Sequence, residues 1–137
     1  MKAHEVMNKN VLVLEPTATV DEACDLMFER DIRHVPIVSD GVVVGIVSDR
    51  DIRCYMADMF SAMSDPREGE EQKKTGINDI MQGKPISVQP DSDIQEAIEA
   101  MLEWKVGAVL VCEPADRLRG IISYEDILEV VRDVTAL

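Results

Sequence analysis

The sequence is poor in the residues that most often build metal sites and disulfide frameworks. It contains two histidines, His4 and His34, which supply few ligands for a His-based metal site. Its cysteines are an odd number and are widely spaced among apolar residues, at Cys24, Cys54 and Cys112. That spacing fits neither a zinc site nor a disulfide framework, so we expect buried thiols and no metal.

Long hydrophobic runs and catalytic signatures are missing as well. No apolar segment approaches the roughly 20 residues that a membrane-spanning helix needs, and the chain does not open with a secretory signal. The Ser/His/Asp order of hydrolases, the HExxH zinc motif, the GxxxxGK[ST] phosphate loop and a Cys–His pair are absent. We therefore expect a cytoplasmic protein that is not an enzyme.

Basic residues and aromatics are also scarce. The 137 residues include 14 Lys and Arg against 27 Asp and Glu, which gives a net charge of −13, and aromatics make up 4 %. Such a surface repels phosphate, so we expect neither nucleic acid nor a membrane as the partner, and we interpret the charge as a solubility feature. With 46 % hydrophobic residues the chain is typical of a globular protein whose core is aliphatic.

What the sequence does contain is an internal repeat. A shift of 74 residues aligns Met7 with Met81, and after a one-residue insertion a shift of 75 aligns Gly45 with Gly120. Further identities follow in the same order: Pro16/Pro90, Glu22/Glu96, Ala23/Ala97, Met27/Met101, Glu29/Glu103, Val35/Val109, Ile46/Ile121, Ser48/Ser123, Asp51/Asp126 and Ile52/Ile127. An ordered series with one small insertion indicates two copies of one unit.

Each copy has the same predicted order of elements. A short helix leads to a short strand, a capped amphipathic helix follows, and two β-branched strands and a second helix complete the unit. The first copy comprises helix 3–7, strand 11–14, a helix with a Thr19/Glu22 capping box (Asp93/Glu96 in the second copy), strands 35–38 and 42–47 around an Asp40-Gly41 turn, and a helix from Ser48. The second comprises helix 77–81, strand 86–88, a helix capped by Asp93, strands 108–112 and 118–122, and a helix from Ser123.

This order predicts an α/β fold of two repeats, each a small mixed β-sheet with two α-helices on one side. We place the first repeat at residues 1–63 and the second at 77–137. Residues 64–76 are polar and contain Pro and Gly, so we interpret them as a linker. Neither repeat has enough apolar surface to be stable alone, and we expect one compact, cooperative module.

Both copies carry a Ser-x-x-Asp segment where the last predicted strand ends, from Ser48 to Asp51 and from Ser123 to Asp126. A helix that begins there exposes backbone N–H groups and favours polar or anionic ligands. A carboxylate in its first turn can accept hydrogen bonds from the hydroxyls of a ribose. The same spacing is that of a plain capping box. Both interpretations stay open, and one Asp can serve both.

The doubled order of short motifs resembles the cystathionine β-synthase (CBS) domain family. The first copy reads Val6-Met7, Pro16, Ala23, Met27, Val35-Pro36-Ile37-Val38 and Gly45-Ile46-Val47-Ser48-Asp49-Arg50-Asp51. Each motif is weak alone, but the doubled set is specific and covers the chain outside the linker. The resemblance implies two repeats related by pseudo-twofold symmetry, with two clefts. In each cleft adenine lies between strands of one repeat, and the ribose meets the Ser and Asp of the other.

Carried onto this sequence, the resemblance implies two nucleotide sites. Cleft A would combine Met7, Leu12, Ile32, Arg33 and His34 with Ile121, Ser123 and Asp126. Cleft B would combine Met81, Ile86, Val106 and Gly107 with Ile46, Ser48, Arg50 and Asp51. The second copy departs from the pattern in two places, because Pro36 has no Pro counterpart and Glu125 stands where the first copy has Arg50.

Basic residues favour cleft A as the site for a phosphate-bearing ligand. Arg33 and His34 belong to the stretch that would line it, and an arginine can clamp phosphate oxygens. The matching stretch of cleft B is Trp104, Lys105, Gly107 and Ala108. Simpler interpretations stay open: Arg30 and Arg33 also fit a solvated helix end, and His34 also fits ordinary packing. Trp104 fits a core or dimer contact better than a base-stacking platform.

The resemblance therefore implies a regulatory module that binds AMP, ADP, ATP or an S-adenosyl compound and reports it to a separate effector protein. The alternative is a structural or assembly module without a nucleotide. We also expect a homodimer, because the second helix of each repeat has more apolar surface than one pair of repeats can cover: Met56, Met59 and Phe60, and Ile127, Val130 and Val131.

Overall fold

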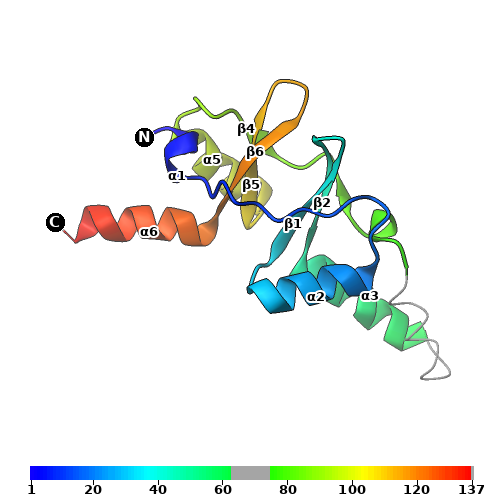
Figure 1. The fold of residues 1–137 in the computed structure, drawn as a ribbon. Coiled ribbons are helices and arrows are strands. Elements are labelled where there is room, and N and C mark those ends of the chain that lie inside the picture. The colour runs from blue at the N-terminus through cyan, green and yellow to red at the C-terminus, as the bar shows by residue number, and fades with distance from the viewer. Residues whose placement is uncertain (63–74, 137) are drawn as a thin grey trace. The chain divides into compact units, whose positions relative to one another are not determined.

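The structure is a computed structural model that describes residues 1–62 and 75–136. Of the predicted linker, residues 64–74 lie outside the described residues. The chain forms two compact units, which Figure 1 shows as ribbons. We call them the middle unit (Leu12–Lys84) and the terminal unit (Met1–Val11 with Pro85–Leu137).

The sheet of the middle unit is built on a β-hairpin. Strand β1 (His34–Ser39) pairs antiparallel with β2 (Val42–Ser48), and β3 (Gln82–Gly83) pairs antiparallel with β2. The hairpin turns at Asp40-Gly41, where φ is 53° and 79°. Two positive φ values are what a tight two-residue hairpin turn needs, so the predicted turn is confirmed.

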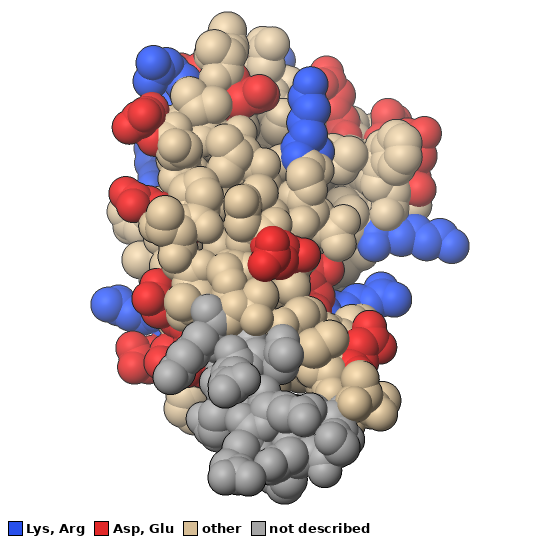
Figure 2. Space-filling view, turned by 90° about the vertical axis from the view of Figure 1, so that its right-hand side faces the viewer, with Lys and Arg blue, Asp and Glu red and all other residues tan. Residues whose placement is uncertain are grey.

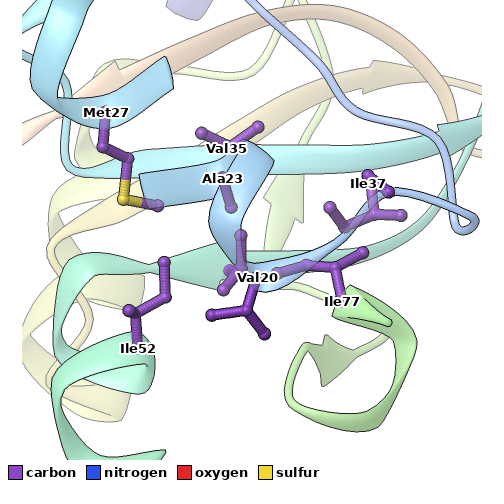
Figure 3. Packing of buried hydrophobic residues seen from close by; sticks show 9 residues of the cluster. Val20, Ala23, Met27, Val35, Ile37, Ile52 and Ile77 are labelled. Carbon is purple, nitrogen blue, oxygen red and sulfur yellow. The ribbon is translucent and has the colours of Figure 1, made fainter. Parts of the chain in front are cut away.

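Two amphipathic helices, α2 (Val20–Arg30) and α3 (Asp49–Ala62), pack against one face of this sheet (Figure 1). Their apolar residues recur every three or four positions, which places them on one side of each helix. The buried side chains of the two layers meet in a purely aliphatic and methionine core (Figure 3): Val20, Ala23, Met27, Ile52, Val35, Ile37 and Val47. Removing each of the valine, isoleucine and methionine side chains from water contributes about 1.5–3 kcal/mol, which makes this face the main source of the unit's stability.

The terminal unit repeats this arrangement. Strand β5 pairs parallel with β4 and antiparallel with β6, and α5 covers the same face as α2 does in the middle unit. Its elements are α1 (Ala3–Val6), β4 (Ser87–Val88), α5 (Ile94–Trp104), β5 (Ala108–Glu113), β6 (Arg117–Ser123) and α6 (Tyr124–Thr135). The chain is therefore a mixed α/β protein built from two copies of one small sheet with helices, as the sequence predicts.

The two sequence repeats exchange their first segments, so each compact unit contains the first segment of the other repeat. The 3₁₀ turn η1 (Ile77–Asp79) belongs to the second repeat, yet Ile77 is fully buried in the core of the middle unit and Met81 packs against it. Conversely, Ala3 and Met7 belong to the first repeat but are buried in the core of the terminal unit. The repeat of the sequence and the compact unit of the structure are therefore not the same set of residues.

The predicted strand at residues 11–14 is wrong, because only Leu14 pairs there, in a single parallel bridge to Ile37. In the second copy β4 forms at this place, and the N–H of Leu110 donates to the carbonyl of Ile86 at 3.0 Å. The residue equivalent to Leu110 is Pro36, which has no N–H to donate. Proline therefore removes the ladder bond that would extend the first copy's strand.

Both predicted N-cap residues cap their helices, but neither forms the reciprocal box predicted with Glu22 or Glu96. The hydroxyl of Thr19 accepts a hydrogen bond from the N–H of Glu22 at 3.2 Å, and α2 starts at the next residue. The carboxylate of Asp93 accepts from the N–H of Gln95 at 3.4 Å rather than from that of Glu96. Each side chain satisfies one of the backbone N–H groups that a helix start leaves without a partner.

The expectation of buried thiols is correct only in part. Cys112 is buried in β5, and burial raises the pKa of its thiol to about 11. Cys24 is half-buried on α2, whereas Cys54 is exposed on α3. Cys54 is exposed because the buried stripe of α3 runs through Ile52, two residues away, and residues two apart point to different sides of a helix.

The surface carries the expected excess of acid. On the part of the face in Figure 2 that described residues form, basic side chains stand among acidic ones rather than in one basic patch. Within the described ranges, none of the helices has the length and hydrophobicity needed to cross a bilayer.

Candidate functional site

The two Ser-x-x-Asp segments lie where a strand runs directly into a helix. In the middle unit β2 ends at Ser48 and α3 begins at the next residue, and the N–H of Ser48 donates to Asp51 Oδ2 at 2.9 Å. The N–H of Asp51 donates back to Ser48 Oγ at 3.1 Å. In the terminal unit the N–H of Ser123 donates to Asp126 Oδ2 at 2.8 Å, and that of Asp126 donates to Ser123 Oγ at 3.4 Å. Both segments are therefore reciprocal capping boxes, as one of the two interpretations predicts.

Capping does not use up these carboxylates. An ionised carboxylate offers about four lone-pair sites on two oxygens, and the backbone bond engages only Oδ2 in each unit. Asp51 and Asp126 are both half-buried, so each remains accessible from one side. The second interpretation, that the same Asp binds a ligand, is compatible with this geometry.

In the middle unit this junction lies beside basic residues. His34 is the β1 partner of Ser48, and the N–H of Asp49 donates to the carbonyl of Arg33 at 2.9 Å. Burial lowers the pKa of His34 below its ordinary value of 6.5, while the carboxylates of Asp49 and Asp51 act in the opposite direction. His34 is therefore a neutral donor and acceptor at the edge of the Asp51 junction at neutral pH.

The terminal unit has the same backbone geometry with different side chains. Ala108 is the β5 partner of Ser123, and the N–H of Tyr124 donates to the carbonyl of Gly107 at 3.2 Å. The positions that carry Arg33 and His34 in the first copy therefore carry only a hydrogen atom and a methyl group in the second. The two junctions are equivalent in backbone but not in charge.

In each unit a methionine of the exchanged segment packs against the strand that leads to the junction. A Cβ atom added to Gly120 would lie 2.5 Å from Met7 Sδ, and one added to Gly45 would lie 2.5 Å from Met81 Sδ. The glycine before each Ile-x-Ser motif is thus needed so that the methionine can approach the strand. Both glycines belong to the repeated motif, but no local pattern in the sequence reveals this reason for them.

The predicted site residues are distributed over both units. The middle unit contains Leu12, Ile32, Arg33, His34, Ile46, Ser48, Arg50, Asp51 and Met81. The terminal unit contains Met7, Ile86, Val106, Gly107, Ile121, Ser123 and Asp126. Each predicted cleft combines residues of both units, so the composition of clefts A and B stays a prediction. Within a unit, the structure brings Met7 to Gly120 of β6 and Met81 to Gly45 of β2, the strands that lead to the two junctions.

One residue that contacts a candidate carboxylate was missed. The side-chain amide of Gln82 donates to Asp51 Oδ1 at 3.1 Å. The two residues are far apart in sequence, and no spacing rule connects them. The only available signal was the position of Gln82, directly after Met81 in the doubled motif.

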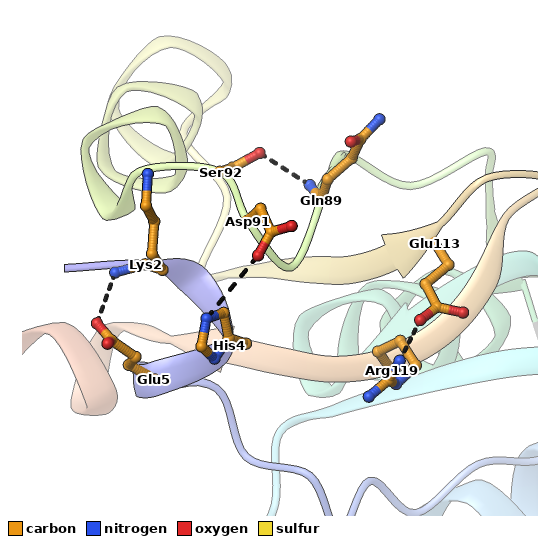
Figure 4. Close-up of polar contacts among 8 residues, drawn as sticks. All are labelled: Lys2, His4, Glu5, Gln89, Asp91, Ser92, Glu113 and Arg119. Carbon is orange, nitrogen blue, oxygen red and sulfur yellow. Dashed lines mark hydrogen bonds and ion pairs between the residues drawn. The ribbon is translucent and has the colours of Figure 1, made fainter.

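A separate pocket of about 460 Å³ opens in the terminal unit, among α1, the turn at Gln89–Asp91 and the β5–β6 hairpin. Two of its three basic side chains have acidic neighbours: Arg119 pairs with Glu113, and His4 Nε2 lies 3.9 Å from Asp91 Oδ1 (Figure 4), while Lys9 is the third. The pocket includes neither Ser123 nor Asp126. Because its charges largely offset one another, we place the candidate site at the strand–helix junctions and not here.

Comparison with known families gives one clear match, which covers both repeats. The family model for the CBS domain matches residues 3–58 and again residues 77–133. The chain is similar to a CBS domain-containing protein of Dictyostelium discoideum, at 26 % identity over 93 % of this chain and 88 % of that protein. It is also similar to a homoserine O-acetyltransferase of Methanohalobium evestigatum, at 27 % identity over 94 % of this chain. The chain spans only 24 % of that enzyme's length.

Two solved structures share the fold over almost the whole chain. The CBS domain pair of protein MJ0100, in complex with 5′-methylthioadenosine and S-adenosyl-L-methionine, matches with a TM-score of 0.82 and 23 % identity over 98 % of both chains. CBSX2 of Arabidopsis thaliana, in complex with AMP, matches with a TM-score of 0.80 and 21 % identity, again over 98 % of both chains. At these identities the likeness establishes the fold.

Proposed function

Because the chain belongs to the CBS domain family, we propose that it is a regulatory module that binds an adenosine nucleotide or an S-adenosyl compound. The observation that carries the proposal is the carboxylate of Asp126, which the helix cap holds through Oδ2 while no described residue donates to Oδ1. A fixed, half-buried acceptor of this kind fits the hydroxyl groups of a ribose. Two proteins of the same fold are known in complex with AMP and with S-adenosyl-L-methionine, respectively, which supports this ligand class.

We assign the ligand contacts as the family resemblance implies. Ser123 and Asp126 hold the ribose in cleft A, and Arg33 binds the phosphate as a bidentate donor. Ser48 and Asp51 have the same role in cleft B. The adenine lies among apolar side chains, which are Met7, Leu12, Ile32 and Ile121 in cleft A and Met81, Ile86, Val106 and Ile46 in cleft B.

Regulation would follow from linkage. A ligand that contacts residues of both repeats favours the arrangement to which it binds more tightly, and only by the difference between its two affinities. The change would be passed to a partner protein. The module would have no catalytic activity of its own, and the acetyltransferase relative would combine such a module with a catalytic region.

The test is calorimetric titration of the protein with AMP, ADP, ATP and S-adenosyl-L-methionine, followed by the Asp126→Ala and Asp126→Asn variants. Losing a hydrogen-bonded carboxylate should weaken binding roughly tenfold to a hundredfold. Asn retains one oxygen for the cap but offers an N–H₂ group to the ligand, so Asp126→Asn should lose affinity without losing the cap. Glu129→Ala removes the same charge from the same helix and should leave the affinity unchanged.

The alternative function is an assembly module, and α6 supports it. None of its side chains is buried, and its apolar residues Leu128, Val131 and Val134 are 64, 48 and 62 % exposed. We propose that this face forms a homodimer, and a monomeric mass at micromolar concentration by sedimentation would contradict that. A dimer that produces no binding heat with any of the four ligands would favour assembly over nucleotide binding.

A further inference from the structure

Gln82 and Asn8 occupy equivalent positions in the two units. Gln82 pairs antiparallel with Ile46 in the middle unit, and Asn8 pairs antiparallel with Ile121 in the terminal unit. These two isoleucines are equivalent residues of the repeat, and each precedes the Ser-x-x-Asp segment by two positions. Gln82 therefore has the same backbone position relative to Asp51 as Asn8 has relative to Asp126.

The two side chains behave differently. The amide Nε2 of Gln82 donates to Asp51 Oδ1 at 3.1 Å, while Oδ2 of the same carboxylate accepts from the N–H of Ser48. Both oxygens of Asp51 therefore have a donor from the protein itself. The Gln82 amide donates a hydrogen bond to this oxygen, as the ribose hydroxyl that would bind there also would.

Asp126 has no such internal partner. Its Oδ2 accepts from the N–H and the hydroxyl of Ser123 at 2.8 and 3.1 Å, and within the described residues no donor reaches Oδ1. Asn8 is one methylene shorter than Gln82, and its own Oδ1 accepts from the N–H of Asn10 at 3.0 Å. Its amide oxygen thus takes part in a local turn.

We propose that Gln82 is a built-in competitor for the ligand at Asp51, which makes the two carboxylates unequal. An adenosine ligand binds first at Asp126, where an acceptor oxygen is ready, and binds at Asp51 only by displacing the Gln82 amide. This inference rests on the proposed function, because it concerns the same two sites. It also assigns selectivity to a residue outside the Ser-x-x-Asp motif.

The expected effect is moderate, because Gln82 is exposed and its hydrogen bond competes with water. A net hydrogen bond of this kind corresponds to about a three- to tenfold change in affinity. Removing the amide should raise the affinity at Asp51 by this factor. Installing a glutamine at position 8 should lower the affinity at Asp126 by a similar factor, because the longer side chain starts from the equivalent backbone position.

The experiment is a titration with AMP in which one carboxylate is removed so that the other site is read alone. In the Asp126→Ala background, Gln82→Ala should strengthen AMP binding three- to tenfold. In the Asp51→Ala background, Gln82→Ala is the matched control and should change nothing, because no carboxylate is left to compete for. In that same background Asn8→Gln should weaken binding. Thermal melts of each variant establish that the folded proteins are compared.

The outcomes separate this inference from the proposed function. If the unmodified protein binds AMP or S-adenosyl-L-methionine but Gln82→Ala leaves the Asp51 site unchanged, the competitor role is wrong and the function stands. If Gln82→Ala weakens binding there, Gln82 is a ligand contact and the inference is overturned. If no variant, including Gln82→Ala, binds either ligand, the proposed function fails and the inference fails with it.

Discussion

Gly120→Ala should destabilise the terminal unit through a collision with the segment that comes from the other end of the chain. The added Cβ would lie 2.5 Å from Met7 Sδ, 2.8 Å from Met7 Cγ and 3.0 Å from the carbonyl oxygen of Asn8. Met7 is 8 % exposed and therefore cannot swing into solvent. Overpacking of this kind costs about 1–3 kcal/mol.

Thermal unfolding followed by circular dichroism measures this cost, because 1 kcal/mol corresponds to roughly 3–5 °C in a chain of this size. Gly83→Ala is the matched control, since a Cβ at Gly83 meets nothing within 4 Å. Its melting temperature should stay close to that of the unmodified protein.

A double-mutant cycle identifies the collision partner. Met7→Ala alone leaves a cavity and should cost about 2–5 kcal/mol. In its presence the two closest contacts of the new methyl group are gone, so Gly120→Ala should cost at least about 1 kcal/mol less than it does alone. Additive effects, or a cost for Gly120→Ala no larger than that for Gly83→Ala, would refute the packing of the first segment against β6.

Three further outcomes follow from the structure. Residues 1–63 expressed alone should show no cooperative thermal transition, because they lack Ile77 and Met81 of the middle unit's core; a sharp transition in a monomer would contradict this. Since burial lowers the pKa of His34, the unfolded chain takes up its proton first, and stability should fall as the pH drops below about 6.5. His34→Gln should flatten that fall in melts between about pH 8 and pH 5, and an unchanged slope would argue against the buried neutral form. Arg33→Ala should weaken AMP more than adenosine in parallel titrations, and an equal loss would mean that Arg33 does not bind the phosphate.

The features that could be predicted from the sequence are those fixed by neighbours in the chain. The helix cap at Thr19, the Asp40-Gly41 turn and the Ser-x-x-Asp boxes each depend on residues within three positions of one another. The repeat made these predictions firmer, because each pattern occurs twice. The β1–β2 hairpin and the helix that precedes it follow from the same local signals.

The features that could not be predicted depend on residues distant in sequence. The strand expected at residues 11–14 is reduced to one bridge by Pro36, which belongs to a different element. The exchange of first segments could not be predicted, because the helical pattern around Met7 is the same whichever unit the helix packs against. The equivalent glycines Gly45 and Gly120 are the sequence feature related to this exchange, since each leaves room for a methionine of the exchanged segment.

The Ser-x-x-Asp segments show why capping and ligand binding need not be alternatives. A capping carboxylate has already lost its rotamer freedom on folding, so a ligand that meets its remaining oxygen pays little further entropy. At Asp126 that oxygen has no donor among the described residues, whereas at Asp51 it accepts from Gln82, which is 31 positions away in sequence. The Ser and Asp of the motif are the same in both copies, so this difference at Oδ1 comes from the segment that each unit receives from the other repeat. Under the proposed competitor role of Gln82, one methylene group, the difference between Asn8 and Gln82, would decide which carboxylate keeps an oxygen for a ligand.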